Sequence, residues 1–150
     1  MKNPVVKYVL LAISFCFVIG IGVATYVFNK PQRNVADEKP AYTVTATEIY
    51  NEFTSNEAQA NQKYLSDKNG KIIQISGSVS EIIAQADTAL TISIKDPEMV
   101  EGGILCSIDK NEIAKAAKFK IADKIVLKGE CTGYVDITGE VSFSKCVVIK

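Results

Sequence analysis

The sequence predicts a mainly β protein whose folded part is a five-stranded Greek-key barrel with a helix between its third and fourth strands. Three observations predict this fold class. Five short runs after residue 70 alternate apolar and polar residues, as half-buried strands do. One capped helical segment falls between the third run and the fourth, and a short helical hairpin is expected before the first run.

The chain opens on an apolar segment. Residues 8–28 carry no charge and are flanked by Lys2 and Lys7 on one side and by Lys30 and Arg33 on the other. As a helix this run is about 30 Å long, which is the thickness of a bilayer's hydrocarbon core. We therefore expect it to form a single transmembrane helix that acts as an uncleaved signal anchor.

The expected topology follows from this anchor. A short basic N-terminus normally stays on the cytoplasmic side, so residues 1–7 are expected in the cytoplasm and residues 41–150 outside the cytoplasmic membrane, in the periplasm. Residues 29–40 contain prolines and charges and are expected to be an exposed linker. A cleaved signal peptide is the alternative, with small residues between positions 20 and 24 as candidate cleavage sites.

Composition restricts the function of the folded part. From residue 41 onward, 15 acidic residues outnumber 12 lysines, so this domain lacks the positive surface expected of a protein that binds a phosphate backbone. The chain has no histidine, which excludes Ser-His-Asp and Cys-His catalytic units and a histidine-bound zinc within it. We expect a protein that is not an enzyme and that carries no cofactor and no metal.

Two helical segments open the folded part. Thr45 and Glu48 have the spacing of a capping box, and the helix that it opens would bury Ile49 and Phe53 on one face. Polar residues interrupt this helix soon after Phe53, and a second helical segment is expected over residues 56–64. We therefore expect a short helical hairpin or a kinked helix.

The strands follow. The expected strands cover residues 71–79, 89–95, 104–108, 125–131 and 141–148. Gly77 inside the first strand predicts a bulge or tight bend there. In the last strand the alternation slips between Phe143 and Cys146, which predicts a second bulge near residues 144–145.

The helix after the third strand has its own start signal. Asp109 and Glu112 have capping-box spacing, and Ile113, Ala116 and Ala117 would share the buried face of a short helix. Three strands, a helix and two further strands form the order of the OB-fold, a small Greek-key barrel.

Several stretches also carry a family resemblance. They are Asn56-Glu57-Ala58-Gln59-Ala60 followed by Lys63-Tyr64, Ile75-Ser76-Gly77-Ser78-Val79, Leu105-Cys106, Val126 to Gly133, and Cys146-Val147-Val148. On these stretches, residues 42–149 resemble the tRNA_anti-like family of small bacterial OB-fold proteins, which are usually membrane-anchored or lipidated. The resemblance implies the fold and a relation to the anticodon-binding domain. It does not imply a function, since a fold hosts many functions.

Cys106, Cys131 and Cys146 are the sharpest candidate site. Cys131 and Cys146 are symmetric about the expected turn at residues 138–139, so we expect them to face each other on adjacent strands, with Cys106 close by. One disulfide with one thiol left over is compatible with an oxidising compartment. The preferred alternative is that all three are inward-facing core residues, where a disulfide would only stabilise the fold. A redox or metal-binding function is the other alternative, although thiols buried on strands lack the setting of reactive ones.

A loop after the second strand could hold calcium. It contains Asp96, Glu98 and Glu101 together with two glycines. The spacing lacks the oxygen-rich pattern of a dedicated calcium site, so a solvated acidic loop is the preferred interpretation.

A basic strip surrounds the short helix and is formed by Lys115, Lys118, Lys120 and Lys124. We expect it to be a solvated face, with nucleic acid or anionic lipid as alternatives. The only aromatic residues on the barrel strands are Tyr134 and Phe143, too few for a platform on which several bases stack.

We therefore expect a non-enzymatic, membrane-anchored OB-fold module that binds a protein, a peptide or an envelope component at its barrel face or rim. One alternative is a nucleic-acid-binding OB-fold protein. The other is an envelope factor that uses its cysteines for redox chemistry or metal binding. The sequence predicts neither the individual partner nor the oligomeric state.

Overall fold

The computed structural model describes residues 16–26, 33–65, 70–85 and 89–150. The chain forms two compact units, residues 1–33 and residues 34–150. In the first unit, residues 16–26 are helical and exposed. None of the described helices is both long enough and apolar enough to cross a membrane. The remainder of the predicted 8–28 span, and the predicted cytoplasmic segment 1–7, lie outside the described residues.

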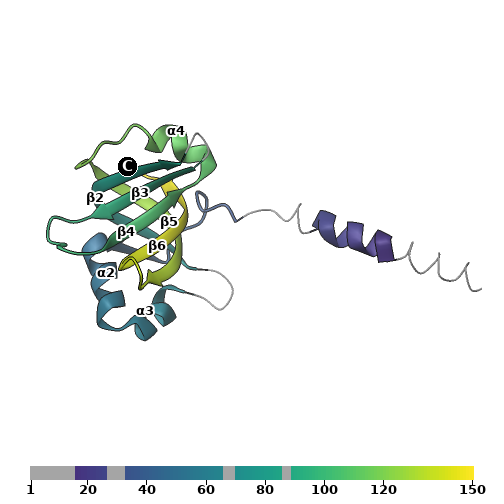
Figure 1. The fold of residues 1–150 in the computed structure, drawn as a ribbon, viewed down its shortest axis with the longest axis horizontal. Coiled ribbons are helices and arrows are strands. Elements are labelled where there is room, and N and C mark those ends of the chain that lie inside the picture. Colours follow the sequence, from purple (N-terminus) through teal and green to yellow (C-terminus); the bar gives the residue numbers. More distant parts are fainter. Residues whose placement is uncertain (1–15, 27–32, 66–69, 86–88) are drawn as a thin grey trace, which may run out of the picture. The chain divides into compact units, whose positions relative to one another are not determined.

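A closed five-stranded barrel forms the centre of the second unit (Figure 1). Its strands are β2 (Ile72–Gln85), β3 (Ala89–Lys95), β4 (Gly103–Ile108), β5 (Lys124–Val135) and β6 (Glu140–Val148). They pair in the order β2-β3-β4-β6-β5, and β5 pairs with β2 to close the barrel. Strands β4 and β6 are parallel, and the other neighbours in the barrel are antiparallel. This arrangement is the OB-fold, so the predicted barrel is confirmed.

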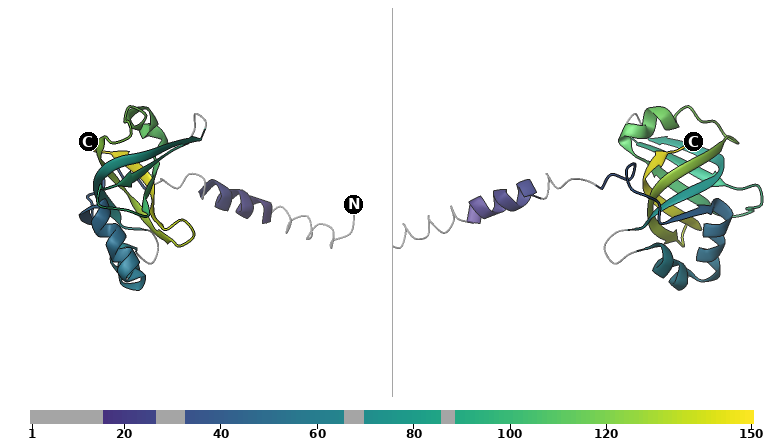
Figure 2. Two further views of the ribbon diagram at one scale, coloured as in Figure 1. Left: turned by 60° about the vertical axis from the view of Figure 1, so that its left-hand side comes forward. Right: turned by 180° about the vertical axis from the view of Figure 1, so that it is seen from behind.

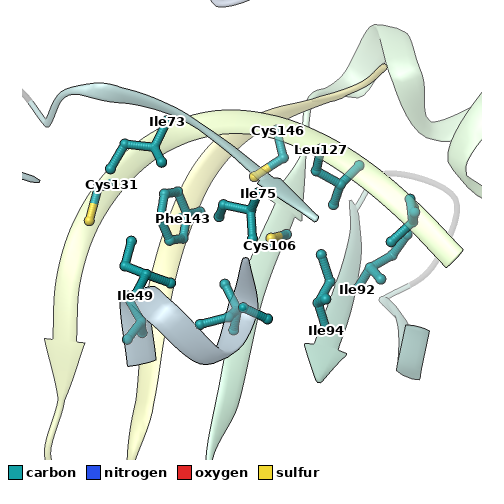
Figure 3. Close-up of a cluster of buried hydrophobic side chains, with 14 of the residues drawn as sticks. Ile49, Ile73, Ile75, Ile92, Ile94, Cys106, Leu127, Cys131, Phe143 and Cys146 are labelled. Atoms are coloured by element: carbon teal, nitrogen blue, oxygen red, sulfur yellow. The ribbon is translucent and has the colours of Figure 1, made fainter. Parts of the chain in front are cut away.

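The inward-facing residues of all five strands fill the barrel (Figure 3). The fully buried members include Ile73, Ile75, Ile92, Ile94, Ile104, Leu127, Val141 and Phe143. Because successive side chains of a strand point to opposite faces, the residues between them form the outer face. The predicted alternation therefore assigned the core positions correctly.

Helices α2 (Ala46–Ser55) and α3 (Glu57–Tyr64) lie at one end of the barrel (Figures 1 and 2). The predicted capping box is present: Thr45 Oγ1 accepts from Glu48 N at 3.2 Å, and Thr45 N donates to Glu48 Oε2 at 2.8 Å. Asn56 separates the helices and caps α3 by accepting from Gln59 N. The predicted helical hairpin is thus confirmed.

A short strand precedes the helices and was not predicted. Strand β1 (Tyr42–Thr45) pairs in parallel with the first half of β2, with Tyr42 opposite Ile73 and Thr45 opposite Ser76. It lies along the half of β2 that does not pair with β3. Four residues are too few to show a period of two in the sequence, and the last of them also caps α2.

The expected linker, residues 29–40, is only partly exposed. Val35 is 2% exposed and forms a small second cluster with Ile72 and Val147. The ammonium of Lys128 donates to the carbonyl oxygens of Ala36 and Glu38, both at 2.8 Å. Residues 34–38, which we call the strap, therefore pack on the outside of β2, β5 and β6, and the compact unit begins at residue 34 rather than 41.

The helical segment between the third and fourth barrel strands is shorter than expected. It consists of a 3-10 turn, η2 (Lys110–Glu112), and one α-helical turn, α4 (Ile113–Ala116). Ala116 is buried as predicted, but Ala117 is exposed. The predicted capping box is absent because the Glu112 carboxylate accepts from the backbone N–H of Val148 instead of bonding at its own helix start.

Both predicted irregularities can be located. In β6, Lys145 has a φ of 52°, and the pairing with both neighbouring strands shifts beside it, so the bulge at residues 144–145 is confirmed. In β2 the register shifts at residue 80 rather than at Gly77. Gly77 serves a different purpose: a Cβ there would collide with the side chain of Ile94, so the glycine permits close packing of β2 on β3.

Candidate functional site

The three barrel cysteines are buried in the core (Figure 3). All four cysteines among the described residues are free thiols. Cys131 lies opposite Phe143 rather than opposite Cys146, and Cys146 lies beside Ile108 of β4. The expected opposition of Cys131 and Cys146 is therefore wrong, while the alternative of inward-facing core residues is confirmed.

The register explains this difference. The last hairpin closes with Val135 opposite Glu140, so its turn is centred before residue 138. A register shift of one residue between Cys131 and Gly133 then places Cys131 opposite Phe143, and the shift between Lys128 and Glu130 restores the original offset. Sequence symmetry about a turn predicts partners only where neither strand bulges.

Burial also makes these thiols unreactive. Desolvation raises the pKa of Cys131 from 9.0 to about 12, and desolvation together with the neighbouring Cys106 raises the pKa of Cys146 well above its usual value. Since the thiolate is the nucleophile and the metal ligand, these cysteines lack the setting of a redox or metal site. No cluster of metal-ligating side chains exists among the residues that the structure describes.

In the acidic loop between β3 and β4, one carboxylate stabilises the fold and the other two are exposed to solvent. The Asp96 carboxylate accepts from the backbone N–H and the hydroxyl of Thr47, at 3.0 and 2.8 Å, and so joins the loop to the start of α2. Glu98 and Glu101 are exposed. The three carboxylates predicted as a calcium alternative therefore do not converge on one point, and the interpretation as a solvated acidic loop holds for Glu98 and Glu101.

Two hollows run side by side between α2 and this loop. One, of about 500 Å³, is lined by residues that include Glu48 and Glu98. The other, of about 450 Å³, is lined by residues that include Met99, Val100 and Glu101. Both share Thr47, Asn51 and Glu98. We call this continuous surface the rim groove.

The rim groove combines exposed apolar surface with negative charge. Val100 is 93% exposed, and Met99 is packed against the core beneath it. Tyr50 lines the same groove, and its pKa is raised by burial first and then by Tyr134 and the negative charge of Glu101. A positively charged group that entered the groove would therefore meet a favourable potential.

An aromatic cluster lies between the helices and the barrel. Phe53 stacks on Tyr64 and Tyr134, with ring centroids 5.8 and 6.4 Å apart, and Tyr42 meets Tyr64 edge to face at 5.4 Å. Tyr134 thus packs on α2, and the other aromatic residue of the barrel strands, Phe143, is in the core. Phe143 is therefore enclosed, and Tyr134 is half-buried against α2.

The sequence did not predict the ion pair that lies beside these rings. The ammonium of Lys63 binds the Glu52 carboxylate at 2.7 Å and lies 4.8 Å from the centroid of the Tyr64 ring. The hydrogen bond to Glu52 is the main reason that the pKa of Lys63 is raised. Lys63 and Tyr64 belong to the stretch that carried the family resemblance. Here they hold α3 against α2, which is a structural role.

The outer face of β3 and β4 is polar and nearly uncharged. Its hydroxyl side chains come from alternate positions of β3, β4 and neighbouring strands: Ser80, Thr91, Ser93, Ser107 and Ser142. Ser80 donates to the carbonyl of Ser93, at 3.1 Å, and its hydroxyl lies 3.0 Å from the hydroxyl of Ser93. This is the face on which OB-folds bind oligonucleotides. In the described strands it presents no aromatic side chain.

The predicted basic strip is only partly free. Lys115 donates to the carbonyl of Val148 at 2.6 Å and pairs with Glu112 at 3.3 Å. Lys118, Lys120 and Lys124 are exposed, and none of them forms an ion pair with the described part of the chain. Three of the four predicted residues therefore leave their charge available.

Fold and site together define an OB-fold domain that carries two helices at one end and a polar rim groove. The chain belongs to the tRNA_anti-like family, whose model matches residues 1–147. A search of curated proteins found no match.

Solved structures also match this chain, at low identity. A candidate nucleic acid-binding lipoprotein from Klebsiella pneumoniae aligns with a TM-score of 0.56 and 16% identity, over 71% of this chain and 91% of that one. An OBody bound to hen egg-white lysozyme gives a TM-score of 0.43 and 16% identity, over 60% and 92% of the two chains. The S. pombe Stn1-Ten1 complex gives 0.40 and 13%, over 53% and 58%.

Proposed function

We propose that this protein is a membrane-tethered, non-enzymatic binding module whose rim groove takes up an extended, positively charged segment of a partner protein in the cell envelope. One observation carries the proposal. Val100 stands almost fully exposed among Glu48, Glu98 and Glu101, at the edge of hollows of about 450 and 500 Å³. Apolar contact combined with carboxylates suits a basic and apolar peptide.

The two glutamates of the loop are free to bind a partner. Asp96 beside them has its hydrogen bonds committed to Thr47, whereas Glu98 and Glu101 form no hydrogen bond or ion pair with the described residues. An exposed valine between two free carboxylates contributes nothing to the stability of the fold. The valine and both carboxylates are therefore accessible to a partner, on a loop held by a rigid barrel.

The tether supports a location in the envelope. The apolar segment 8–28 has the length and the flanking charges of a membrane anchor. The family model extends over that segment, since it matches from residue 1. In this proposal the domain from residue 34 onward lies outside the cytoplasmic membrane.

Nucleic acid is the second candidate ligand, and one observation favours it. The Klebsiella lipoprotein with the same fold is described as a candidate nucleic acid-binding protein. Against it stand the hydroxyl-lined outer face without aromatic side chains and the excess of acidic residues from residue 41 onward. The redox alternative is not supported, because the cysteine thiols are buried.

The experiment uses full-length protein with a photo-crosslinking residue in place of Val100, expressed in cells. We expect this variant to crosslink to one protein partner, and the charge-neutral pair Glu98→Gln/Glu101→Gln to weaken the crosslink. The same crosslinker in place of Ser107, on the outer face of the barrel, is the matched control and should not capture that partner.

Two results would count against the proposal. One is equal capture from Val100 and Ser107. The other is salt-dependent binding of a single-stranded oligonucleotide by the purified chain that the Glu98→Gln/Glu101→Gln variant leaves unchanged or strengthens, because removing negative charge helps a phosphate backbone to bind.

A further inference from the structure

The end of the barrel that carries α4 has a different kind of surface. Helix α4 and the C-terminus lie at that end, and α2 and α3 lie at the other (Figures 1 and 2). Residues 118–124 lead from α4 into β5, whose first residue is Lys124, and Lys118, Lys120 and Lys124 lie within three residues of Ile121 in the sequence. We call residues 118–124 the basic loop.

We propose that the basic loop is a membrane-contact surface that places Ile121 in the interface of an anionic lipid bilayer, with these lysines on the lipid headgroups. This proposal rests on the tether described above but not on the peptide ligand of the rim groove. A bilayer is the expected ligand because its surface has two layers. The apolar boundary suits the Ile121 side chain, and the negative headgroups suit the lysines next to it in the sequence.

The exposure of Ile121 is imposed by the fold. Its side chain is 68% exposed, although Phe119 in the same loop packs against the core. Both backbone groups of Val79 in β2 bond to the loop: Ala122 N donates to Val79 O at 2.8 Å, and Val79 N donates to Asp123 O at 2.9 Å. These two bonds hold the loop in one position with Ile121 directed outward.

The loop closes on itself as well. Lys120 N donates to Asp123 Oδ2 at 2.8 Å, and Asp123 N donates to Lys120 O at 3.1 Å. Ala122 has a φ of 74°, a conformation that residues other than glycine seldom adopt. A rigid loop that keeps a large apolar side chain in water is preorganised for an apolar environment, because binding then costs little conformational entropy.

The positive charges of the basic loop also favour contact with an anionic bilayer. Lys118, Lys120 and Lys124 have no ion-pair partner among the described residues. Lys124 shares one hollow with Asp96 and Pro97 of the acidic loop, whereas Lys118 and Lys120 line none of the hollows described above. A negative leaflet therefore attracts the basic loop through these lysines. Each lysine close to such a surface changes the affinity by roughly fivefold.

The length of the tether permits this contact. In the proposed topology the span ends at residue 28 and the strap begins at residue 34, where Val35 fixes the chain to the barrel. The five residues between them extend at most about 20 Å. A linker of that length limits how far the folded unit can move from the bilayer.

The test exploits the absence of tryptophan from the chain. The full-length Ile121→Trp variant carries a single indole and is reconstituted into vesicles of phosphatidylcholine alone or of phosphatidylcholine with phosphatidylglycerol. We expect a blue shift of emission and a roughly twofold loss of quenching by acrylamide only in the anionic vesicles. Ile137→Trp is the matched control: Ile137 is 96% exposed in the β5–β6 turn, and its indole should stay in water in both.

A charge-reversed variant completes the test. Lys118→Glu/Lys120→Glu in the Ile121→Trp background should abolish the shift without changing the unfolding temperature, since neither side chain bonds to the fold. Co-sedimentation with phosphatidylcholine vesicles measures the tether separately. If the chain sediments and the indole at position 121 stays equally quenched in both lipids, the loop does not touch the bilayer. An oligonucleotide that shifts this emission when anionic vesicles do not would also overturn the proposal.

Discussion

The ammonium of Lys128, in the middle of β5, donates a hydrogen bond to the carbonyl oxygen of Ala36, 2.8 Å away and 92 residues earlier in the chain. It donates a second bond to Glu38 at the same distance. Lys128 is only 7% exposed, so these carbonyls replace the water that its charge would otherwise hold. The strap is thus part of the folded domain.

The first prediction concerns the domain boundary. A fragment that starts at residue 34 should fold with higher stability than one that starts at residue 41. The shorter fragment loses the burial of Val35, about 1.5 to 3 kcal/mol, and leaves the buried ammonium of Lys128 without acceptors. Urea unfolding followed by circular dichroism measures the difference. Equal midpoints for the two fragments would show that the strap is not part of the fold.

The strap also shows where sequence patterns stop being informative. Val35 is a single apolar residue within a charged segment and gives no period, so its contact with Ile72 and Val147 depends entirely on the tertiary fold. The barrel strands were predicted because each buries at least three alternating positions. Strand β1 has only four residues, and its pairing is a contact with β2 that no local pattern reports.

The candidate site was likewise only partly predictable from the sequence. The acidic loop and the basic loop were recognisable because their charges are adjacent in sequence. The rim groove was not, because it requires α2 and the β3–β4 loop to meet. The cysteine positions failed for a third reason: the last turn is centred one residue earlier than expected, and the bulge at Thr132 of β5, which leaves no clear mark in the sequence, shifts the register by one further residue.

The second prediction separates Asp96 from its acidic neighbours. Asp96→Ala should lower the free energy of unfolding by about 1 to 2 kcal/mol, because α2 loses an acceptor for the N–H and the hydroxyl of Thr47 in its first turn. Glu98→Ala, which removes an exposed carboxylate, should change it by less than about 0.5 kcal/mol. Millimolar calcium should leave both unfolding curves in place. A calcium-dependent rise in stability that Glu98→Ala abolishes would restore the calcium interpretation.

The third prediction concerns Tyr64. Its ring is fully buried, and its hydroxyl has no hydrogen-bond partner among the described residues, although the Lys63–Glu52 pair lies close by. Tyr64→Phe keeps the ring and removes an unsatisfied hydroxyl, so stability should stay the same or rise slightly. Tyr64→Ala should cost about 3 to 5 kcal/mol through lost packing. Thermal unfolding distinguishes them, and a loss above about 1.5 kcal/mol for Tyr64→Phe would reveal a hydrogen bond that stabilises the fold.

The fourth prediction concerns Gly70, which begins the approach to β2. A Cβ at this position would overlap the carbonyl group of Cys131, which belongs to the backbone of β5 and cannot rotate away. Gly70→Ala should therefore destabilise the domain by more than about 2 kcal/mol, beyond the usual effect of a single substitution. Gly20→Ala, with nothing within 4 Å of its Cβ, is the matched control in the full-length chain. Similar unfolding curves for the two variants would contradict the close packing.

The last prediction concerns alkaline pH. Because burial raises the pKa of Cys131 from 9.0 to about 12, the folded protein keeps this proton while the unfolded chain releases it above pH 9. The unfolded state then binds fewer protons, so the free energy of unfolding falls as the pH rises from 9 toward 12. Cys131 alone should account for a loss of about 1 kcal/mol between pH 9 and pH 10, and Cys146, whose pKa is also raised, adds to it.

The measurement is urea unfolding at pH 8, 9 and 10 with a reducing agent present, so that no disulfide forms. Cys131→Ala lowers stability at every pH because it leaves a small cavity, but it should flatten the alkaline slope, since one titrating group is gone. Ser107→Ala, at an exposed position of β4, should leave the slope unchanged. An identical slope in the protein and in Cys131→Ala would mean that the thiol is accessible to water, and the case against a redox function of the cysteines would then lose its physical basis.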